Sequence, residues 1–311
     1  MLDVPSVISR TCFLLTVLFN STLIYLTLFQ TKEIVGTYRN MIITFASIGI
    51  CFSTLDILVR PMFHSFNGCV FYFTLGNTFR NSKMLSELSL LLYTGVYGVV
   101  MAFLTVQFMY RAVILARPPL AKHFDGYKLV IWIFYSILVG AFWTTAASCV
   151  YPDQNVYDYL RTEILDAYGV EIKTVPGFAI LAYNNDGKIR WNSVASISLV
   201  TILISSQYSI MLYSGVTMYQ NIKESMNTSS SYYARLQKQF FLTLVYQVSA
   251  PSLLFHAPAF IVLFAPFFDF KFSLHSGIIV YGFSAYPLVD SLIVLGVITE
   301  YKNAILDEFE I

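Results

Sequence analysis

Ionisable side chains inside apolar segments are the residues of this sequence most able to do chemistry. Asp56, Glu87 and Asp290 fall in or beside long apolar runs. A carboxylate surrounded by hydrocarbon is costly, so each should face the interior of a helical bundle or water. Asp56 is expected to pair with Arg60 one turn later. Glu87 either begins a helix at an exposed position or meets a ligand, and Asp290, which lies deeper, should make an interior polar contact.

A second group of polar side chains is spaced so that its members share helix faces. Tyr93 and Tyr97 are one helical turn apart, and His256 lies in the middle of another apolar run. A further set, at steps of three and four, should pack against neighbouring helices or line a cavity: Ser198, Thr201, Ser205, Tyr208 and Ser209. If the helices enclose a pocket, the candidate ligand-binding residues are Tyr93, Tyr97, Ser205 and His256. Ordinary helix packing is the alternative for each of them.

Motifs of well-known enzyme classes are missing from the sequence. It has no glycine-rich phosphate-binding loop, no His-Glu-x-x-His and no Gly-x-Ser-x-Gly. None of its four cysteines forms a Cys-x-x-Cys pair, so a zinc site is not expected. We therefore expect no enzymatic activity, no cofactor and no metal. The net charge of +1 gives no reason to expect nucleic-acid binding.

The four cysteines fall into two groups. Cys12 and Cys51 lie within apolar runs, where a cysteine is expected to pack as a small hydrophobic residue. Cys69 and Cys149 lie near helix ends that we expect outside the cell, where oxidation is permitted. These two residues form either a disulfide or two free thiols.

Seven long apolar runs must position all of these side chains. Hydrophobic residues make up 57% of the 311-residue chain and charged residues only 12%, against about 25% charged in soluble domains. Runs of roughly 20 residues cross a bilayer as helices, because lipid leaves the edges of an open sheet unpaired. We expect an all-α, single-domain bundle of seven transmembrane helices over residues 1–311, its first helix retained. The expected spans are Ser6–Phe29, Met41–Met62, Leu85–Tyr110, Leu129–Val150, Ser193–Tyr219, Phe240–Phe264 and Ser276–Thr299.

The distribution of basic residues favours one orientation of the bundle. With the long segment Tyr151–Asn192 set aside, Lys and Arg are more frequent in the segments that are cytoplasmic when the N-terminus is outside. We therefore expect an extracellular N-terminus, a cytoplasmic C-terminus, and a segment Tyr151–Asn192 that caps the outer mouth. The sequon at Asn227 would then face the cytoplasm and stay unglycosylated.

Five short motifs occur in a characteristic order along the chain. They are Gly36-Thr37-Tyr38-Arg39-Asn40, Gln107-Phe108-Met109-Tyr110-Arg111, Leu236-Gln237-Lys238-Gln239-Phe240-Phe241, Tyr286-Pro287-Leu288-Val289-Asp290 and Tyr301-Lys302-Asn303-Ala304-Ile305. Together they resemble the Str superfamily of nematode serpentine chemoreceptors, which are seven-helix G-protein-coupled receptors. Two positions depart from the family pattern: Ala112 stands where a second aromatic residue is usual, and Ser291 where a proline is usual.

The resemblance implies a plasma-membrane receptor in the cilium of a sensory neuron. Such a receptor would detect an external odorant or pheromone-like small molecule and activate a heterotrimeric G protein. It implies that Arg111 takes part in the activation switch; Tyr110 replaces the acid that precedes this arginine in rhodopsin-like receptors, so an ion pair within the motif is not expected. The residues assigned to coupling and activation are Tyr110, Arg111, Lys238, Gln239, Pro287 and Asp290.

Two other readings of the sequence stay open. A transporter or ligand-gated channel could also have seven apolar helices, although no inverted repeat is visible and Pro251, Pro258 and Pro287 cluster in the last two spans. The N-terminus of a seven-helix chemoreceptor channel would lie inside the cell. Alternatively, the departures at Ala112 and Ser291 indicate a receptor-like protein that has lost signalling.

Overall fold

The computed structural model of the chain describes residues 4–31, 34, 36–76, 78–79, 81–184, 186–228, 231–268, 273–275 and 277–309. Side chains are not described at residues 4–6, 225–228, 231–234, 273–275, 277–278 and 307–309. The sequon at Asn227 therefore lies outside the described side chains.

Seven helices in the described part of the chain are long and apolar enough to cross a membrane. They cover Val7–Gln30, Gly36–Val59, Lys83–Ala116, Gly126–Ser148, Trp191–Glu224, Arg235–Phe268 and Ile279–Val297. This confirms the predicted seven-helix bundle. The largest differences are at span ends: the second span stops at Val59, before Met62, and the third continues to Ala116.

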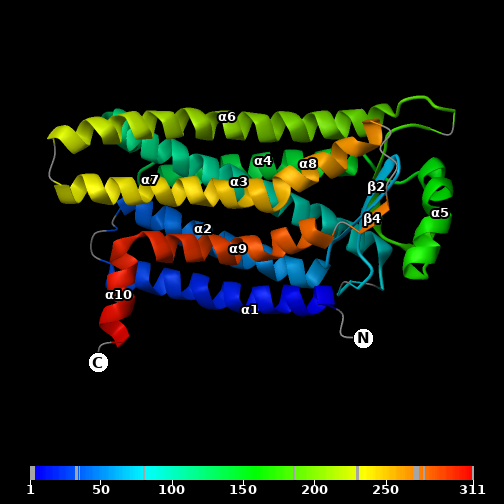
Figure 1. The fold of residues 1–311 in the computed structure, drawn as a ribbon, viewed down its shortest axis with the longest axis horizontal. Helices are drawn as coiled ribbons and strands as arrows, with labels where there is room; N and C mark the ends of the chain where they lie inside the picture. Colours follow the sequence, from blue (N-terminus) through cyan, green and yellow to red (C-terminus); the bar gives the residue numbers. More distant parts are fainter. Residues whose placement is uncertain are drawn as a thin grey trace.

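The helices are named by their bounds, with α3 at the centre of the bundle. They are α1 (Val4–Tyr25), α2 (Gly36–Val59), α3 (Lys83–Ala116), α4 (Leu129–Ser148), α6 (Trp191–Thr228), α7 (Ser231–Pro251), α8 (Ala257–Phe264), α9 (Gly277–Val297) and α10 (Thr299–Phe309). Helix α3 packs against α2, α4, α6 and α7, whereas α1 packs against α2 and α9 (Figure 1). A short π-helical segment, η5 (Ser252–His256), joins α7 to α8, so these three elements form one continuous span.

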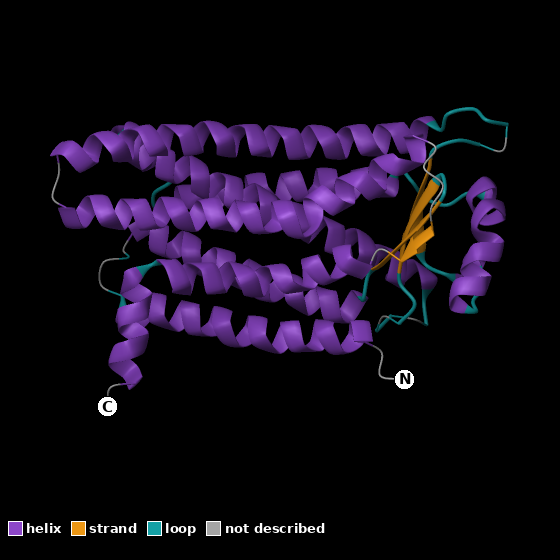
Figure 2. Cartoon of the chain, in the orientation of Figure 1, coloured by secondary structure: helices purple, strands orange, loops and turns teal. Residues whose placement is uncertain are grey.

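A four-stranded antiparallel sheet covers one end of the bundle (Figure 2). Its strands are β1 (Met62–Phe66), β2 (Cys69–Phe73), β3 (Gly177–Leu181) and β4 (Ser273–His275), in the spatial order β3-β2-β1-β4. Phe71 in β2 lies opposite His64 of β1 and Ala179 of β3. The sheet was not predicted, and it is built from three different interhelical connections.

Helix α5 (Gln154–Tyr168) packs on the face of the sheet that points away from the bundle (Figure 1). Val156, Leu160 and Ile164 recur every four residues, which places them on one side of the helix, and all three are fully buried against the sheet. The Asp153 side chain caps the helix by accepting a hydrogen bond from the Val156 amide at 3.1 Å. Gly169 ends the helix in the left-handed conformation, with φ of 68°.

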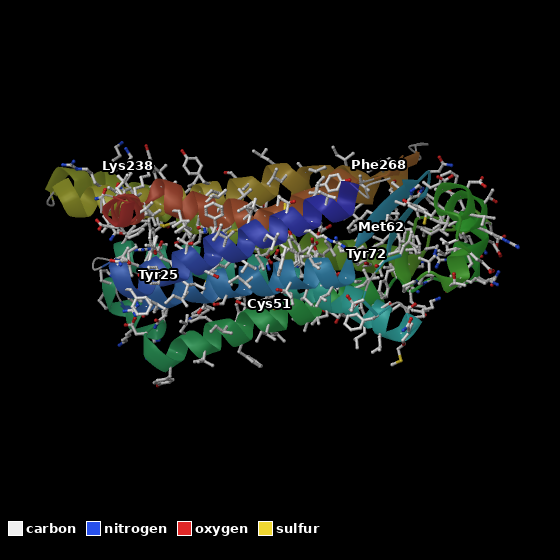
Figure 3. The ribbon with its side chains drawn as sticks, turned by 90° about the horizontal axis from the view of Figure 1, so that it is seen from below. Tyr25, Cys51, Met62, Tyr72, Lys238 and Phe268 are labelled. Carbon is white, nitrogen blue, oxygen red and sulfur yellow. The ribbon has the colours of Figure 1, made fainter. Side chains whose placement is uncertain are left out.

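The bundle therefore has two distinct ends, which we call the sheet end and the α10 end. The sheet end carries the sheet, α5 and the beginning of α1, and the α10 end carries α10, the end of α6 and the beginning of α7 (Figure 1). Seen from below, Met62, Tyr72 and Phe268 lie toward the sheet end, and Lys238 lies toward the opposite end (Figure 3).

Candidate functional site

A large cavity lies between the helices directly beneath the sheet. Its volume is about 430 Å³, which is within the range of roughly 300–1,000 Å³ typical of ligand pockets. Helices α3, α4, α6, α8 and α9 contribute to its walls. The sheet contributes to its lining as well, through Phe63, Val70, Tyr72, Phe178 and Ile180. The segment Tyr151–Asn192 thus lies over the cavity through strand β3 and helix α5, as the predicted cap would; that this end is outside the cell stays a prediction.

All four predicted ligand-binding residues line this cavity. Tyr93 and Tyr97 reach it from α3, Ser205 from α6, and His256 from η5. Their common location follows from the spacing on α3 and from the packing of α3 against α6. Among the hydroxyl residues predicted on the same face of α6, Thr201 and Tyr208 also line the cavity, whereas Ser198 and Ser209 are exposed.

The polar groups of the cavity form a cluster around His256. The Nδ1 atom of His256 lies 2.7 Å from the Tyr208 hydroxyl, and its Nε2 atom contacts the Tyr97 hydroxyl. Tyr208 also contacts the Ser252 hydroxyl at 2.6 Å. These contacts join α3, α6 and η5 within the membrane-spanning part of the bundle. The remainder of the described lining is largely aromatic and aliphatic, and none of the lining residues is Asp, Glu, Lys or Arg.

Asp56 is not paired with Arg60, contrary to the prediction. Its carboxylate is buried and accepts hydrogen bonds from Ser9 at 2.5 Å, Ser284 at 2.7 Å and Tyr93 at 3.0 Å. The Arg60 amide still donates a hydrogen bond to the Asp56 carbonyl at 2.9 Å, but the helix ends at Val59 and Arg60 has a positive φ of 49°, so its side chain does not continue the regular helical direction. Asp56 therefore ties α1, α3 and α9 to α2, and Tyr93 connects this cluster with the cavity.

Glu87 lies outside the lining of the cavity. Its two carboxylate oxygens accept hydrogen bonds from the Tyr151 hydroxyl, each at 3.1 Å, and Lys83 lies 3.8 Å away. Glu87 lies near the start of α3, as one of the two alternatives expected, but its side chain is only 13% exposed rather than freely exposed.

Arg111 occupies a second candidate site, near the α10 end of α3. Its guanidinium carbon lies 3.3 Å from the centroid of the Tyr38 ring in α2 and 3.8 Å from that of Phe240 in α7. The residue is only 4% exposed, and its Nε and Nη2 atoms are buried without a hydrogen-bond partner among the described residues. Two aromatic rings therefore hold this buried cation. Tyr110, which precedes it, is buried beside Phe124.

The other residues assigned to activation lie on α7 and α9. Lys238 is exposed, and the Gln239 amide donates a hydrogen bond to the Thr299 hydroxyl at 2.7 Å, which links α7 to α10. The Pro287 carbonyl accepts a hydrogen bond from Asn20 at 3.3 Å. Asp290 is buried and hydrogen-bonded to Gln247, so the expected interior polar contact is present in the structure.

The structure does not join Cys69 to Cys149, and all four cysteines are free thiols. Cys69 is completely buried in β2 between the sheet and α5, whereas Cys149 is exposed at the end of α4. The hydrophobic cluster beneath α5 thus encloses one thiol and leaves the other outside it. The burial of Cys69 could not be predicted from the sequence, because the sheet that buries it was not predicted either.

The seven apolar helices, with a roofed cavity at one end and a buried arginine at the other, define a multi-pass membrane protein of the seven-helix receptor type. The family described as "Serpentine type 7TM GPCR chemoreceptor Str" matches residues 5–306. The chain belongs to this family.

Known relatives agree with the family assignment. The chain is 41% identical to G-protein coupled receptor str-33 of Caenorhabditis elegans, over 99% of this chain and 91% of that protein. It is 24% identical to Serpentine receptor class r-10 of the same organism, over 94% of this chain and 87% of that protein. It is 22% identical to G-protein coupled receptor str-217 of C. elegans, over 99% of this chain and 90% of that protein. These relatives are named as receptors, a class of proteins that are not enzymes.

Proposed function

We propose that this protein is a chemosensory G-protein-coupled receptor of the plasma membrane. An external small molecule binds in the cavity beneath the sheet, and a heterotrimeric G protein binds at the α10 end. The family of the chain supports this proposal, as does the separation of the cavity from Arg111 along the bundle. In this orientation the N-terminus and the sheet are extracellular, in keeping with the distribution of basic residues.

One structural feature carries the proposal: a single continuous span contacts both sites. His256 lies in η5 beside the cavity, and Phe240 lies in α7 against the Arg111 guanidinium. Pro251 stands between them, where it removes a backbone hydrogen bond and favours bending of the helix. A molecule that shifts His256 therefore acts on the same rod that holds Arg111.

We infer that the contact of Arg111 with Tyr38 and Phe240 belongs to the inactive conformation. In the active conformation the α10 end of α7 moves away, Phe240 leaves the guanidinium, and Arg111 becomes available to the G protein with Tyr110, Lys238 and Gln239. A ligand can drive this change only through its difference in affinity for the two conformations. The links from Pro287 to Asn20 and from Asp290 to Gln247 are rearranged in the same step.

A ligand-panel screen in cells that carry a calcium or cyclic-nucleotide reporter tests the proposal. The chain should respond to at least one small molecule, and both Arg111→Ala and His256→Ala should lower that response at equal surface expression. Arg161→Ala, an exposed basic residue on α5 that lies away from the cavity and from the α10 end, is the matched control. A response that Arg111→Ala leaves unchanged would contradict the coupling role.

The orientation and location of the protein need separate measurements. Epitope tags at both termini, probed on intact cells, should be accessible only at the N-terminus; an accessible C-terminus would favour the channel-like arrangement. A fluorescent fusion expressed in nematode sensory neurons should accumulate in the cilium. Glycosylation at Asn227 would contradict the proposed orientation.

A further inference from the structure

We propose that the cavity binds an uncharged, mainly apolar molecule with one hydrogen-bonding group, and that this molecule enters sideways from the bilayer between α6 and α8. The inference rests on the proposed ligand-binding role of the cavity. It adds a ligand class and a route of entry, each supported by its own observations.

The composition of the lining determines the ligand class. Aromatic and aliphatic side chains form most of it, and no Asp, Glu, Lys or Arg is among the residues that line it. A charged ligand would lose its hydration there without gaining a partner of opposite charge, which is strongly unfavourable. The His256 cluster is the main concentration of polar groups, and it can exchange one of its internal hydrogen bonds for a bond to a ligand hydroxyl or carbonyl.

The sheet closes the direct route into the cavity from the sheet end. Side chains from three of its strands, among them Phe63, Tyr72 and Phe178, form the roof. Helix α5 covers the far face of the same sheet (Figure 2). A molecule arriving from that side would have to pass both layers, and the cluster that joins them includes the fully buried Phe71 and Phe73.

The wall between α6 and α8 is different, because residues that line the cavity there are also exposed. Ser205 on α6 and Ala257 on α8 are exposed lining residues, and Phe260, also in the lining, is 60% exposed. Side chains that line the cavity and are also exposed on the outer surface indicate an entrance on the side of the bundle.

This side entrance faces lipid. The neighbouring outer surfaces of α6 and η5–α8 are apolar: Ile202, Leu253 and Ile261 are each more than 60% exposed. Ala257 lies eleven residues before the end of its span at Phe268, or about 17 Å along a helix. That depth lies within the hydrocarbon core, which is roughly 30 Å thick. Molecules that dissolve in the bilayer therefore have access to the entrance, whereas ions do not.

Fluorescence quenching of Trp143, which lines the cavity, tests the ligand class. The full-length receptor, purified in nanodiscs with Trp132→Phe and Trp191→Phe, retains Trp143 as its single tryptophan reporter. The probes are the neutral nitroxide TEMPO and its trimethylammonium and carboxylate derivatives. We expect saturable quenching by TEMPO and at least tenfold weaker quenching by both charged probes. Equal quenching by a charged probe would overturn the proposed class.

Two neighbouring substitutions separate binding in the cavity from collisions in the bilayer. Ser205→Phe fills the entrance and should remove the saturable quenching. Ser206→Phe is the matched control, because Ser206 is also exposed on α6 but does not line the cavity; it should leave quenching unchanged. Circular dichroism confirms that both variants fold. If the two variants quench alike, the probe does not bind in the cavity.

A lipid acyl chain is also uncharged and apolar, so a separate experiment must distinguish lipid in the cavity from a small-molecule ligand. In nanodiscs of phosphatidylcholine brominated on its acyl chains, Trp143 should be quenched equally in the Ser205→Phe and Ser206→Phe variants. Strong quenching confined to Ser206→Phe would show that lipid fills the cavity, and would overturn the proposal of a small-molecule ligand.

Thiol labelling tests the route of entry. In a Ser205→Cys variant, the new thiol should react with bilayer-soluble N-phenylmaleimide. With the membrane-impermeant reagent sulfonatoethyl methanethiosulfonate, the same thiol should react at least tenfold more slowly than native Cys149 does. Cys149 is exposed at the sheet end and serves as the internal control. Equal reaction of both thiols with the impermeant reagent would show that water reaches the cavity, and would overturn sideways entry. None of these measurements needs a G protein, so a failure of the reporter screen is a separate result.

Discussion

The guanidinium carbon of Arg111 lies 3.3 Å from the centroid of the Tyr38 ring, a contact that joins α3 to α2 at the α10 end. Phe240 of α7 contacts the same group, and its ring lies 4.7 Å from that of Tyr38 in an edge-on arrangement. Three helices therefore meet at one cation. We propose that the two aromatic faces act here as an acidic side chain acts in an ion-pair lock.

Tyr38→Leu should raise ligand-independent signalling, because it removes one of the two aromatic faces that hold Arg111. A desolvated cation–π contact contributes about 0.5–2 kcal/mol, which corresponds to roughly a 2- to 30-fold rise in the active population. Basal reporter output at equal surface expression measures this change. Tyr213→Leu, on an exposed face of α6, is the control and should have no effect. Unchanged basal output in Tyr38→Leu would contradict the proposed lock.

Ser284→Ala should destabilise the bundle by about 0.6–1.7 kcal/mol, the usual contribution of an interhelical hydrogen bond in a membrane. It removes one of the three hydroxyls that donate to Asp56. Thermal denaturation of the purified protein measures the loss. Ser206→Ala is a suitable control, because that hydroxyl bonds only within its own helix, to the Leu203 carbonyl. In an Asp56→Ala background the Ser284→Ala change should have no further effect; an undiminished loss there would argue against the contact.

Gly98→Ala should destabilise the contact between α3 and α4 by about 1–3 kcal/mol, as overpacking usually does. A methyl group at this position would meet the indole ring of Trp143 and the backbone of Gly140. Because Trp143 lines the cavity, the variant should also weaken the response to ligand. Gly296→Ala provides the comparison: no atom lies within 4 Å of a methyl group there, so stability should stay level or rise. A larger loss of melting temperature in Gly296→Ala than in Gly98→Ala would refute this account.

Acid should loosen α5 from the sheet. Burial raises the pKa of Asp153, but hydrogen bonds from Arg190 and from the Val156 amide outweigh burial and hold the pKa below its ordinary value of 3.8. A carboxyl with a depressed pKa stabilises the fold at pH above its ordinary value, and this stabilisation is lost as the pH falls through the folded-state value. The contribution is small, roughly 0–1 kcal/mol, because the side chain is nearly half exposed.

Hydrogen exchange of the α5 amides at about pH 6 and about pH 3 measures this loss. The ratio of protection between the two pH values should be larger in the natural chain than in Asp153→Asn. Asparagine keeps a capping oxygen but has no charge to lose. The same ratio in both proteins would show that the Asp153 charge does not hold α5.

The seven spans could be predicted because hydropathy is a local property of the sequence. The shared location of Tyr93 and Tyr97 was equally accessible, since a spacing of four residues fixes a common helix face. Ser205 and His256 line the same cavity because α3, α6 and η5 pack together. Which helices pack together cannot be predicted from the sequence of any one helix. The role of the four residues in binding stays a proposal.

The sheet escaped prediction for a different reason. Its strands have at most five residues, and Cys69 pairs with Leu181 across more than a hundred residues of sequence. No turn motif or alternating apolar pattern in the sequence indicates such a distant strand pairing. The sequence analysis therefore predicted neither the roof of the cavity nor the burial of Cys69. The contact of Arg111 with Tyr38 and Phe240 was missed because aromatic residues are common throughout the chain and carry no positional signal.

The sheet fastens three interhelical connections together at one end, whereas α6 and α7 at the other end are joined by a single connection. A rod held at one end acts as a lever. The span Arg235–Phe268 has 34 residues and is about 51 Å long, so each degree of tilt about its fastened end displaces the free end by roughly 0.9 Å. A shift at His256, twelve residues before Phe268, would therefore grow about 2.5-fold at Lys238, which lies thirty residues before that end.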